Sequence, residues 1–250
     1  MSAAGETPRT ARAVIIGNEL LSGKIADKNL PVLARTMRRL GIVLDRAVVV
    51  PDVLDVIARE VREAAAAATW VFTSGGVGPT HDDLTIAAVA AAFDEEVVVS
   101  PELEAMIRNA YGDRLREGHL FMARIPRGAR LVKNGEIPWP ATLMRNVFVL
   151  PGVPEIFEMK MKLVEDEVGV GAPFVTLAVL STLDEGNLKP LLDAVVTEFP
   201  DVDVGSYPRW TDPKIRTKLT FDARDRAACE RAREAFVARL PEGALAGLEG

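Results

Sequence analysis

The chain has 250 residues, and its 30 Lys and Arg against 36 Asp and Glu give a formal net charge of −6. Hydrophobic residues make up 48% and charged residues 26%, a balance that excludes a disordered chain and is typical of a folded globular protein. Because general nucleic-acid binders are usually basic, the acidic balance predicts no nucleic-acid partner. One cysteine and two histidines exclude an intrachain disulfide framework and leave oxygen atoms as the expected ligands of any metal.

The chain also lacks the apolar segments that membrane proteins need. Its longest apolar runs have the length of strands, well short of the ~20 residues of a membrane-spanning helix. The first ten residues are small and polar and contain no signal-peptide core. We therefore expect a cytoplasmic protein without a membrane partner.

Up to residue 168, predicted strands and helices alternate. Short β-branched runs end at Gly or Pro, and the segments between them carry apolar residues at helical spacing. This order predicts an α/β fold with three α/β/α layers and a mostly parallel sheet. Residues 119–146 contain scattered Gly and Pro and are predicted to be loop-rich with short strands. In chain order, strands are expected at 13–16, 42–50, 70–72, 97–99 and 147–150, and helices at 29–40, 53–68 and 83–93. A further helix is expected to start at Pro101 with Ser100 as its cap, and another is expected to follow the strand at 147–150 and to end at about residue 168.

A Gly-rich segment at 169–173 is typical of a linker, and a second pattern follows it. A strand at 174–181, a helix at 185–199, strands at 202–207 and 214–221 and a helix at 226–240 predict a small α+β module. The predicted organisation is a flexible N-terminus over 1–11, an α/β domain over 12–170 and the module over 174–250. Trp139 and Trp210 lie beside Pro-containing turns, and for each we favour a packing role over stacking on a ligand.

Three predicted strands end in Gly-containing loops that lead into helices. These loops are residues 17–23 (GNELLSG), 74–80 (SGGVGPT) and 150–154 (LPGVP). Parallel strands place their carboxyl ends at one edge of a sheet, which is where open α/β sheets bind ligands. We therefore expect the three loops to lie together.

The 74–80 loop is the most informative of the three. Glycines let successive backbone N–H groups point into one concavity, and the following helix N-terminus adds positive potential, so the loop suits a phosphate. It is neither a Walker loop nor a Rossmann fingerprint. A tight turn without a ligand remains the alternative interpretation.

Acidic residues surround this loop. Asp82 and Asp83 follow it directly, Asp52 ends the second predicted strand, and Glu19 follows the first. Carboxylates repel a phosphate, and a divalent cation would reconcile the two because Mg²⁺ is commonly held by one or two carboxylates plus phosphate oxygens. The alternative for Asp82 and Asp83 is that one of them caps the next helix, which we favour for one of the pair.

At these residues the chain resembles a known family. Residues 17–29, 73–85 and 150–155 resemble the N-terminal domain of the CinA family, within the molybdopterin-binding superfamily of the MoaB, MogA and gephyrin type. The resemblance covers about residues 12–168. The final module, with VGSYP at 204–208, resembles the tail that follows this domain in eukaryotic FAD synthases.

The resemblance implies the molybdopterin-binding fold, a pterin- or nucleotide-sized ligand containing phosphate, and a homo-oligomer, either a dimer or a trimer. It implies that Asp83 and Asp52 serve a metal and the reaction, with Asp82 assisting, and that the metal is Mg²⁺, with Mn²⁺ or Co²⁺ as alternatives. The residues expected to bind phosphate or nucleotide are Gly17, Asn18, Glu19, Ser22, Gly23, Ser74, Gly75, Gly76, Val77, Gly78, Thr80, Pro151, Gly152 and Pro154.

Three functional hypotheses follow. The first is a divalent-metal-dependent nucleotide pyrophosphatase that acts on ADP-ribose or FAD-type substrates, as the resemblance to the CinA branch implies. The second is a molybdopterin-binding or adenylyl-transfer protein of molybdenum cofactor biosynthesis. The run Gly-Gly-Val-Gly-Pro-Thr-His-Asp-Asp follows the CinA pattern more closely than the Gly-Gly-Thr-Gly pattern of the adenylyltransferases. The third is a non-enzymatic nucleotide-sensing or interaction module.

Overall fold

The structure, a computed structural model, describes residues 9–212 and 214–250, so most of the segment predicted to be flexible at 1–11 lies outside the described residues. The chain divides into two compact units, one that ends at Gly171 and one over Ala172–Gly250. The first strand of the first unit begins at Thr10, two residues before the expected start of the domain. None of the helices in the described part of the chain is long and apolar enough to cross a membrane.

The first unit is built on a six-stranded sheet with strand order β2-β1-β3-β8-β7-β6. The pairs β1–β2, β1–β3 and β3–β8 are parallel, whereas β6–β7 and β7–β8 are antiparallel, so the sheet is mostly parallel as predicted. The strands are β1 (Thr10–Ile16), β2 (Val43–Val50), β3 (Trp70–Ser74), β6 (Arg130–Val132), β7 (Ala141–Met144) and β8 (Val147–Leu150).

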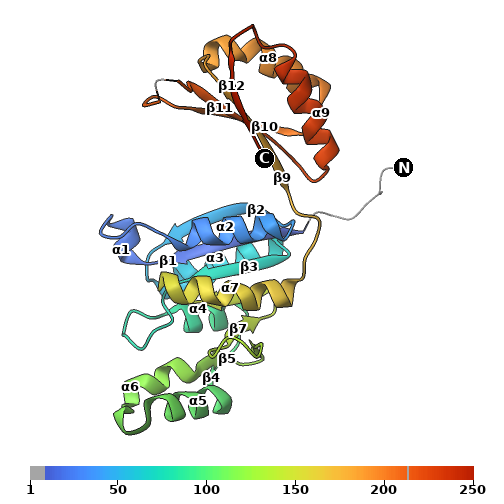
Figure 1. The fold of residues 1–250 in the computed structure, drawn as a ribbon. Helices are drawn as coiled ribbons and strands as arrows, with labels where there is room; N and C mark the ends of the chain where they lie inside the picture. The colour runs from blue at the N-terminus through green and yellow to red at the C-terminus, as the bar shows by residue number, and fades with distance from the viewer. Residues whose placement is uncertain (1–8, 213) are drawn as a thin grey trace. The chain divides into compact units, whose positions relative to one another are not determined.

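Helices cover both faces of this sheet (Figure 1). One face packs against α2 (Asn29–Arg39) and α7 (Pro154–Val168), and the other against α3 (Leu54–Ala67) and α4 (Thr85–Ala92). The alternation of strand side chains explains the two cores, because Ala13 and Ile15 join the α2–α7 core while Val14 and Ile16 join the other. The predicted three-layer fold is confirmed.

A lobe over residues 97–126 extends from the first unit and has its own small core. Ser100 caps α5 as predicted, since its Oγ accepts the N–H of Leu103 at 3.3 Å. The region predicted to be loop-rich, 119–146, contains the end of a short helix and one 3₁₀ turn in addition to its strands. The elements not yet named in this unit are α1 (Asn18–Leu21), β4 (Val97–Val99), α5 (Pro101–Tyr111), the 3₁₀ turns Gly112–Arg114 and Phe121–Ala123, α6 (Glu117–Leu120) and β5 (Arg124–Pro126).

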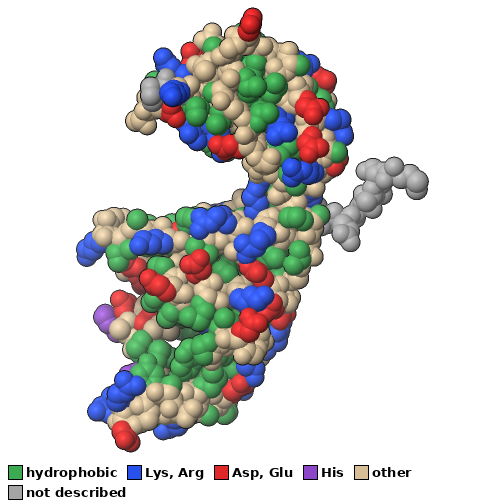
Figure 2. Space-filling model, viewed as in Figure 1, with side chains coloured by type: hydrophobic (Ala, Val, Ile, Leu, Met, Phe, Trp, Pro, Cys, Tyr) green, Lys and Arg blue, Asp and Glu red, His purple; other side chains and the backbone are tan. Residues whose placement is uncertain are grey.

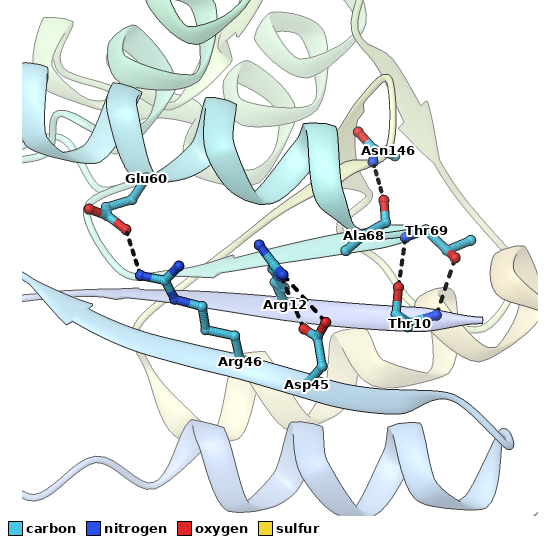
Figure 3. Close-up of polar contacts among 8 residues, drawn as sticks. All are labelled: Thr10, Arg12, Asp45, Arg46, Glu60, Ala68, Thr69 and Asn146. Atoms are coloured by element: carbon cyan, nitrogen blue, oxygen red, sulfur yellow. Dashed lines mark hydrogen bonds and ion pairs between the residues drawn. The ribbon is translucent and has the colours of Figure 1, made fainter. Parts of the chain in front are cut away.

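Polar side chains tie the amino ends of the central strands together (Figure 3). The Thr10 and Thr69 backbone N–H groups donate to each other's hydroxyl oxygens at 3.2 and 3.3 Å. Asn146, just before β8, donates from its amide to the carbonyls of Ala65 and Ala68 at 3.0 Å each. These bonds anchor the starts of β1, β3 and β8, and the loops discussed below leave from the opposite edge.

The second unit has the order β-α-β-β-α-β with an antiparallel sheet, β10-β11-β9-β12, which is a ferredoxin-like arrangement. The predicted module therefore has one additional strand, β12. That strand was missed because its sequence, LAGLE, contains glycine and no β-branched residue, and its pairing with β9 is long-range. The elements are β9 (Val175–Ser181), α8 (Glu185–Glu198), β10 (Asp203–Pro208), β11 (Thr217–Ala223), α9 (Arg226–Val237) and β12 (Leu245–Glu249).

The packing role favoured for Trp210 is wrong. Its side chain is 90% exposed, because it lies in the connection between β10 and β11, beyond the core that the two strands share with α8 and α9. Trp139, in contrast, packs beside the lobe core of the first unit.

Candidate active site

The loops that follow β1, β2, β3 and β8 meet at the carboxyl edge of the large sheet, as the alternating pattern predicted. The Gly17 N–H donates to the carbonyl of Val50 at 3.1 Å, which joins the first loop to the end of β2. The Gly75 N–H donates to the carbonyl of Leu150 at 3.2 Å, which joins the second loop to the third. The backbone alone therefore holds these segments side by side.

Gly75 has to be glycine for two reasons. Its φ is +102°, and a methyl group on its Cα would lie 2.3 Å from the carbonyl oxygen of Ile16. A methyl group on Gly152 would in turn lie 3.2 Å from the Cα of Gly75. Small residues therefore allow the loop after β3 to pass closely between its two neighbours.

The same loop presents free backbone donors. Thr85, the first residue of α4, is fully buried, and it fixes the loop by donating from its hydroxyl to the Gly75 carbonyl at 2.7 Å and from its N–H to the Gly76 carbonyl at 2.9 Å. In the described part of the chain, the N–H groups of Gly76, Val77 and Gly78 donate to no protein acceptor. We call residues 75–78 the phosphate nest, because a fixed loop with unpaired N–H groups is suited to an anion.

Asp83 closes the loop rather than capping a helix. Its Oδ2 accepts the Thr80 N–H at 2.7 Å, and the Thr80 hydroxyl lies within hydrogen-bond distance of both Asp83 and Asp82. The helix α4 begins at Thr85 with Leu84 before it and has no side-chain cap. The capping role favoured for one of the two aspartates is therefore wrong, because the Asp83 carboxylate turns back toward the loop.

Asp82 and its neighbour His81 lie on the outer rim of the loop. Hydrogen bonding, chiefly from the Thr80 hydroxyl, holds the pKa of Asp82 below its ordinary value. The His81 side chain is 97% exposed, and its Nδ1 lies 3.9 Å from Asp82 Oδ1.

Asp52 lies at the same edge but is engaged elsewhere. Its Oδ2 accepts the N–H of Asn18 at 2.8 Å, so it links the end of β2 to the first loop. Among the described residues, no group of three or more His, Cys, Asp and Glu side chains is placed to hold a metal ion. The carboxylate that lines the cavity beside the phosphate nest is that of Asp83. One carboxylate beside an anion site fits Mg²⁺, which completes its shell with phosphate oxygens and water.

The phosphate nest opens into a cavity of about 400 Å³ that we call the lobe cavity. Its walls come from α4, from α7 and from the lobe, and they are mainly apolar with aromatic side chains. In Figure 2 hydrophobic side chains gather around a hollow between the layered part and the lobe. A mostly apolar cavity with a few polar groups at one end is typical of a site for a ring-containing ligand. The aromatic side chains are Tyr111, Phe121 and Trp139.

Lys160 is a polar residue in the wall of this cavity, and it was not predicted from the sequence. Its side chain is 8% exposed, and its Nζ donates to the carbonyls of Trp139, at 3.3 Å, and Pro140. Burial lowers the pKa of Lys160 to about 8. The signal was present in the sequence, because Lys160 shares a helical face with the buried residues Phe157 and Val164.

The structure places the predicted site residues in two groups. Those lining the lobe cavity are Val77, Gly78, Thr80, Asp83 and Pro151. Those at the carboxyl edge that do not line it are Gly17, Asn18, Glu19, Ser22, Gly23, Asp52, Ser74, Gly75, Gly76, Asp82, Gly152 and Pro154. Of the latter, Ser22 and Gly23 are exposed in the turn after α1, whereas Ser74 and Gly75 are buried at the base of the phosphate nest.

Comparison with known proteins shows which family the chain is similar to. The family model described as probable molybdopterin binding domain matches residues 12–168. The chain belongs to this family. A second model, the middle domain of FAD synthase, matches residues 173–249 of this molybdopterin-binding-domain protein. Both findings confirm the resemblances drawn from the sequence.

Several individual proteins are similar in sequence to this molybdopterin-binding-domain protein. A protein of Archaeoglobus fulgidus is 30% identical over 223 residues, which cover 89% of this chain and 94% of the relative. A probable FAD synthase of Caenorhabditis elegans is 31% identical over 89% of this chain, which spans only 49% of that enzyme. A CinA-like protein of Desulfosudis oleivorans is 38% identical over 174 residues, 67% of this chain and 41% of the relative.

A solved structure also resembles the first unit. The crystal structure of the protein CinA from Thermoplasma acidophilum, described as having unknown function, has a TM-score of 0.59 and 30% identity. It covers 65% of this chain and 99% of its own.

Proposed function

We propose that this protein is a divalent-metal-dependent nucleotide pyrophosphatase that acts on ADP-ribose or FAD-type substrates. One observation carries the proposal: Val77 and Gly78, whose backbone N–H groups are free, and Asp83 line the same mostly apolar lobe cavity of about 400 Å³. An anion site, a cation ligand and a ring pocket are together what a nucleoside diphosphate requires.

Each part has a separate role in this proposal. The amides of Gly76, Val77 and Gly78 bind one phosphate, and the lobe cavity receives the ring. Asp83 is the main ligand of Mg²⁺, Mn²⁺ or Co²⁺, Asp52 is the second acid of the edge, and Asp82 assists from the rim. When bound, a divalent ion neutralises phosphate charge and activates water.

The reaction adds one water molecule across the phosphoanhydride. The water oxygen forms a new bond to one phosphorus, the bond from that phosphorus to the bridging oxygen breaks, and the proton of the water ends on the released phosphate or on solvent. From ADP-ribose the products are AMP and ribose 5-phosphate. Asp83 is positioned on the nest side of the cavity, where this phosphate is expected.

A screen of substrates and metals tests the proposal. Purified protein is incubated with ADP-ribose, FAD or NAD and with Mg²⁺, Mn²⁺ or Co²⁺, and the products are read by mass. We expect AMP only when a metal is present. Asp83→Asn keeps an oxygen that accepts from Thr80 but loses the charge, so we expect turnover to fall about 100-fold or more.

Asp212→Asn is the matched control. Asp212 also closes a loop, by accepting the N–H groups of Lys214 at 2.9 Å and Ile215 at 3.0 Å, but it lies in the second unit. We expect this variant to keep wild-type turnover. Absence of AMP under every condition, or equal turnover in Asp83→Asn and Asp212→Asn, would contradict the proposal.

A second candidate is a molybdopterin-binding or adenylyl-transfer protein. The match to the probable molybdopterin binding domain over residues 12–168 favours it. Incubation with molybdopterin and ATP, followed by mass analysis, tests it, because adenylyl transfer adds AMP to the pterin and releases diphosphate. Binding of molybdopterin without a mass change would leave pterin binding as the function.

A further inference from the structure

One buried amide, Asn29, connects the loops of the candidate site. Asn29 is the first residue of α2, and its side chain is 3% exposed. A polar residue at a helix start usually faces solvent, but here Asp27 accepts the N–H groups of Asn29, at 3.2 Å, and Leu30, at 2.9 Å. The Asp27 carboxylate thus satisfies the helix start and leaves the Asn29 amide to point inward.

The Asn29 amide bridges two loops with its two N–H bonds. Its Nδ2 donates to the hydroxyl oxygen of Ser74 at 2.8 Å and to the carbonyl oxygen of Gly152 at 2.9 Å. The Ser74 hydroxyl in turn donates to the carbonyl of Pro151 at 3.4 Å. Ser74 directly precedes the phosphate nest, and Pro151 and Gly152 belong to the loop after β8. A short chain of hydrogen bonds therefore joins α2, the phosphate nest and the third loop.

The chemistry of this bridge requires a neutral amide. The carbonyl of Gly152 can only accept, and the Ser74 proton is already given to Pro151, so both partners need a donor. In addition, the Asn29 Oδ1 is buried without a hydrogen-bond partner among the described residues. An unpaired buried acceptor is unfavourable for folding.

We propose that Asn29 is a positioning residue of the phosphate site. Its amide holds the loop at 74–78 against the loop at 150–154, so that the free N–H groups of the phosphate nest stay in place. The choice of AMP as the ligand in the test below rests on the proposed function, whereas the hydrogen bonds of Asn29 are independent of it.

The variants are chosen to separate positioning from stability. Asn29→Asp has nearly the same shape, but its ionised carboxylate has no proton to donate and faces the carbonyl oxygen of Gly152, which can only accept. Ser74→Ala removes one partner and leaves α2 intact, so it serves if Asn29→Asp does not fold. Asn146→Asp is the matched control, because the Asn146 amide also donates two hydrogen bonds, here to the carbonyls of Ala65 and Ala68 at the opposite edge of the sheet. Figure 3 shows the bond to Ala68.

The first measurement is amide hydrogen exchange in the full chain, resolved by NMR. The Gly75 N–H is bonded to the Leu150 carbonyl, so its exchange rate reports opening between the two loops. We expect this rate to rise about tenfold or more in Asn29→Asp and in Ser74→Ala, and to stay at the wild-type value in Asn146→Asp. Unchanged exchange at Gly75 in the Asn29 and Ser74 variants, or the same rise in Asn146→Asp, would overturn the proposal.

The second measurement is the affinity for AMP, taken well below the melting temperature of every variant. A purely structural role lowers the melting temperature but leaves the Kd of the folded protein unchanged. Positioning predicts that Kd rises about tenfold in Asn29→Asp and less than about twofold in Asn146→Asp. An unchanged Kd in Asn29→Asp contradicts the proposal. If the wild-type protein binds no AMP, the proposed function fails, and the exchange rate at Gly75 alone decides the role of Asn29.

Discussion

The buried amine of Lys160 gives the protein a specific dependence of stability on pH. Burial lowers the pKa of this lysine from 10.5 to about 8, whereas the unfolded chain keeps the ordinary value. Between these two pH values the unfolded chain binds more protons than the folded chain, so the free energy of unfolding rises with pH in this window. At about 1.4 kcal/mol per pKa unit, the charged lysine costs the folded state about 3 kcal/mol near neutral pH.

The test compares the wild-type chain with Lys160→Met in urea unfolding. The difference in unfolding free energy, wild type minus variant, is expected to rise by about 2 kcal/mol from pH 7 to pH 10. Subtracting the variant removes the contributions of all other titrating groups. The matched control is Lys162→Met, because Lys162 is on the same helix but half-exposed and pairs with Asp166 at 3.5 Å. A rise of the same size in that variant would show that the pH dependence does not come from the burial of Lys160.

An NMR titration of the Lys160 Cε resonance measures the same pKa directly. A midpoint near pH 8 would agree with the urea result. A midpoint near 10.5, together with a flat difference between wild type and Lys160→Met, would show that solvent reaches the amine. Lys160 would then not be a buried wall of the lobe cavity.

Three further predictions concern the stability of the first unit and the assembly of the chain. Gly75→Ala adds a methyl group 2.3 Å from the Ile16 carbonyl and should destabilise the first unit by more than about 2 kcal/mol in urea unfolding. Gly23→Ala, at φ +73° with open space around its Cα, is the control and should lower the free energy of unfolding by only about 1 kcal/mol. Equal losses of stability in the two variants would contradict the close approach of Gly75 to the Ile16 carbonyl. Ser100→Ala removes the bond from the Leu103 N–H and should cost about 1 kcal/mol, measured in the same way, and an unchanged stability would argue against the cap. We also expect light scattering to give the mass of a dimer or trimer, and a monomer at all concentrations would contradict that expectation.

The carboxyl-edge loops could be predicted because their placement depends on local patterns. Each strand of the parallel part is a short apolar run followed by a Gly- or Pro-containing turn and a helix. That order alone brings the Gly17, Gly75 and Gly152 loops to one edge. The phosphate nest follows from the same logic.

The lobe cavity could not be predicted, because its walls come from segments that are far apart in the chain. Ile86 of α4, Ile107 of the lobe and Lys160 of α7 meet only through tertiary packing. No periodicity within one helix reveals which neighbour it will face. The one local indication was the position of Lys160 on the apolar face of its helix, which predicts that its side chain is buried.

Asp83 illustrates a different limit. An aspartate two residues before a helix is equally suited to cap it or to close the preceding turn. Only the backbone path of the loop, which turns the Thr80 N–H toward the carboxylate, decides between the two roles. Asn29 was similarly hidden, since a helix-start asparagine usually remains at the surface.

In the proposed function, a nucleotide phosphate binds at the phosphate nest beside Asp83. The most direct measurement is an NMR titration of the backbone amides with AMP in the presence of Mg²⁺. We expect the amide resonances of Gly76, Val77 and Gly78 to shift most strongly, because their N–H groups are free to donate. We also expect Asp83→Asn to weaken the Mg²⁺-dependent part of the shift. Shifts that avoid residues 75–78 and cluster elsewhere in the chain would contradict phosphate binding at the nest.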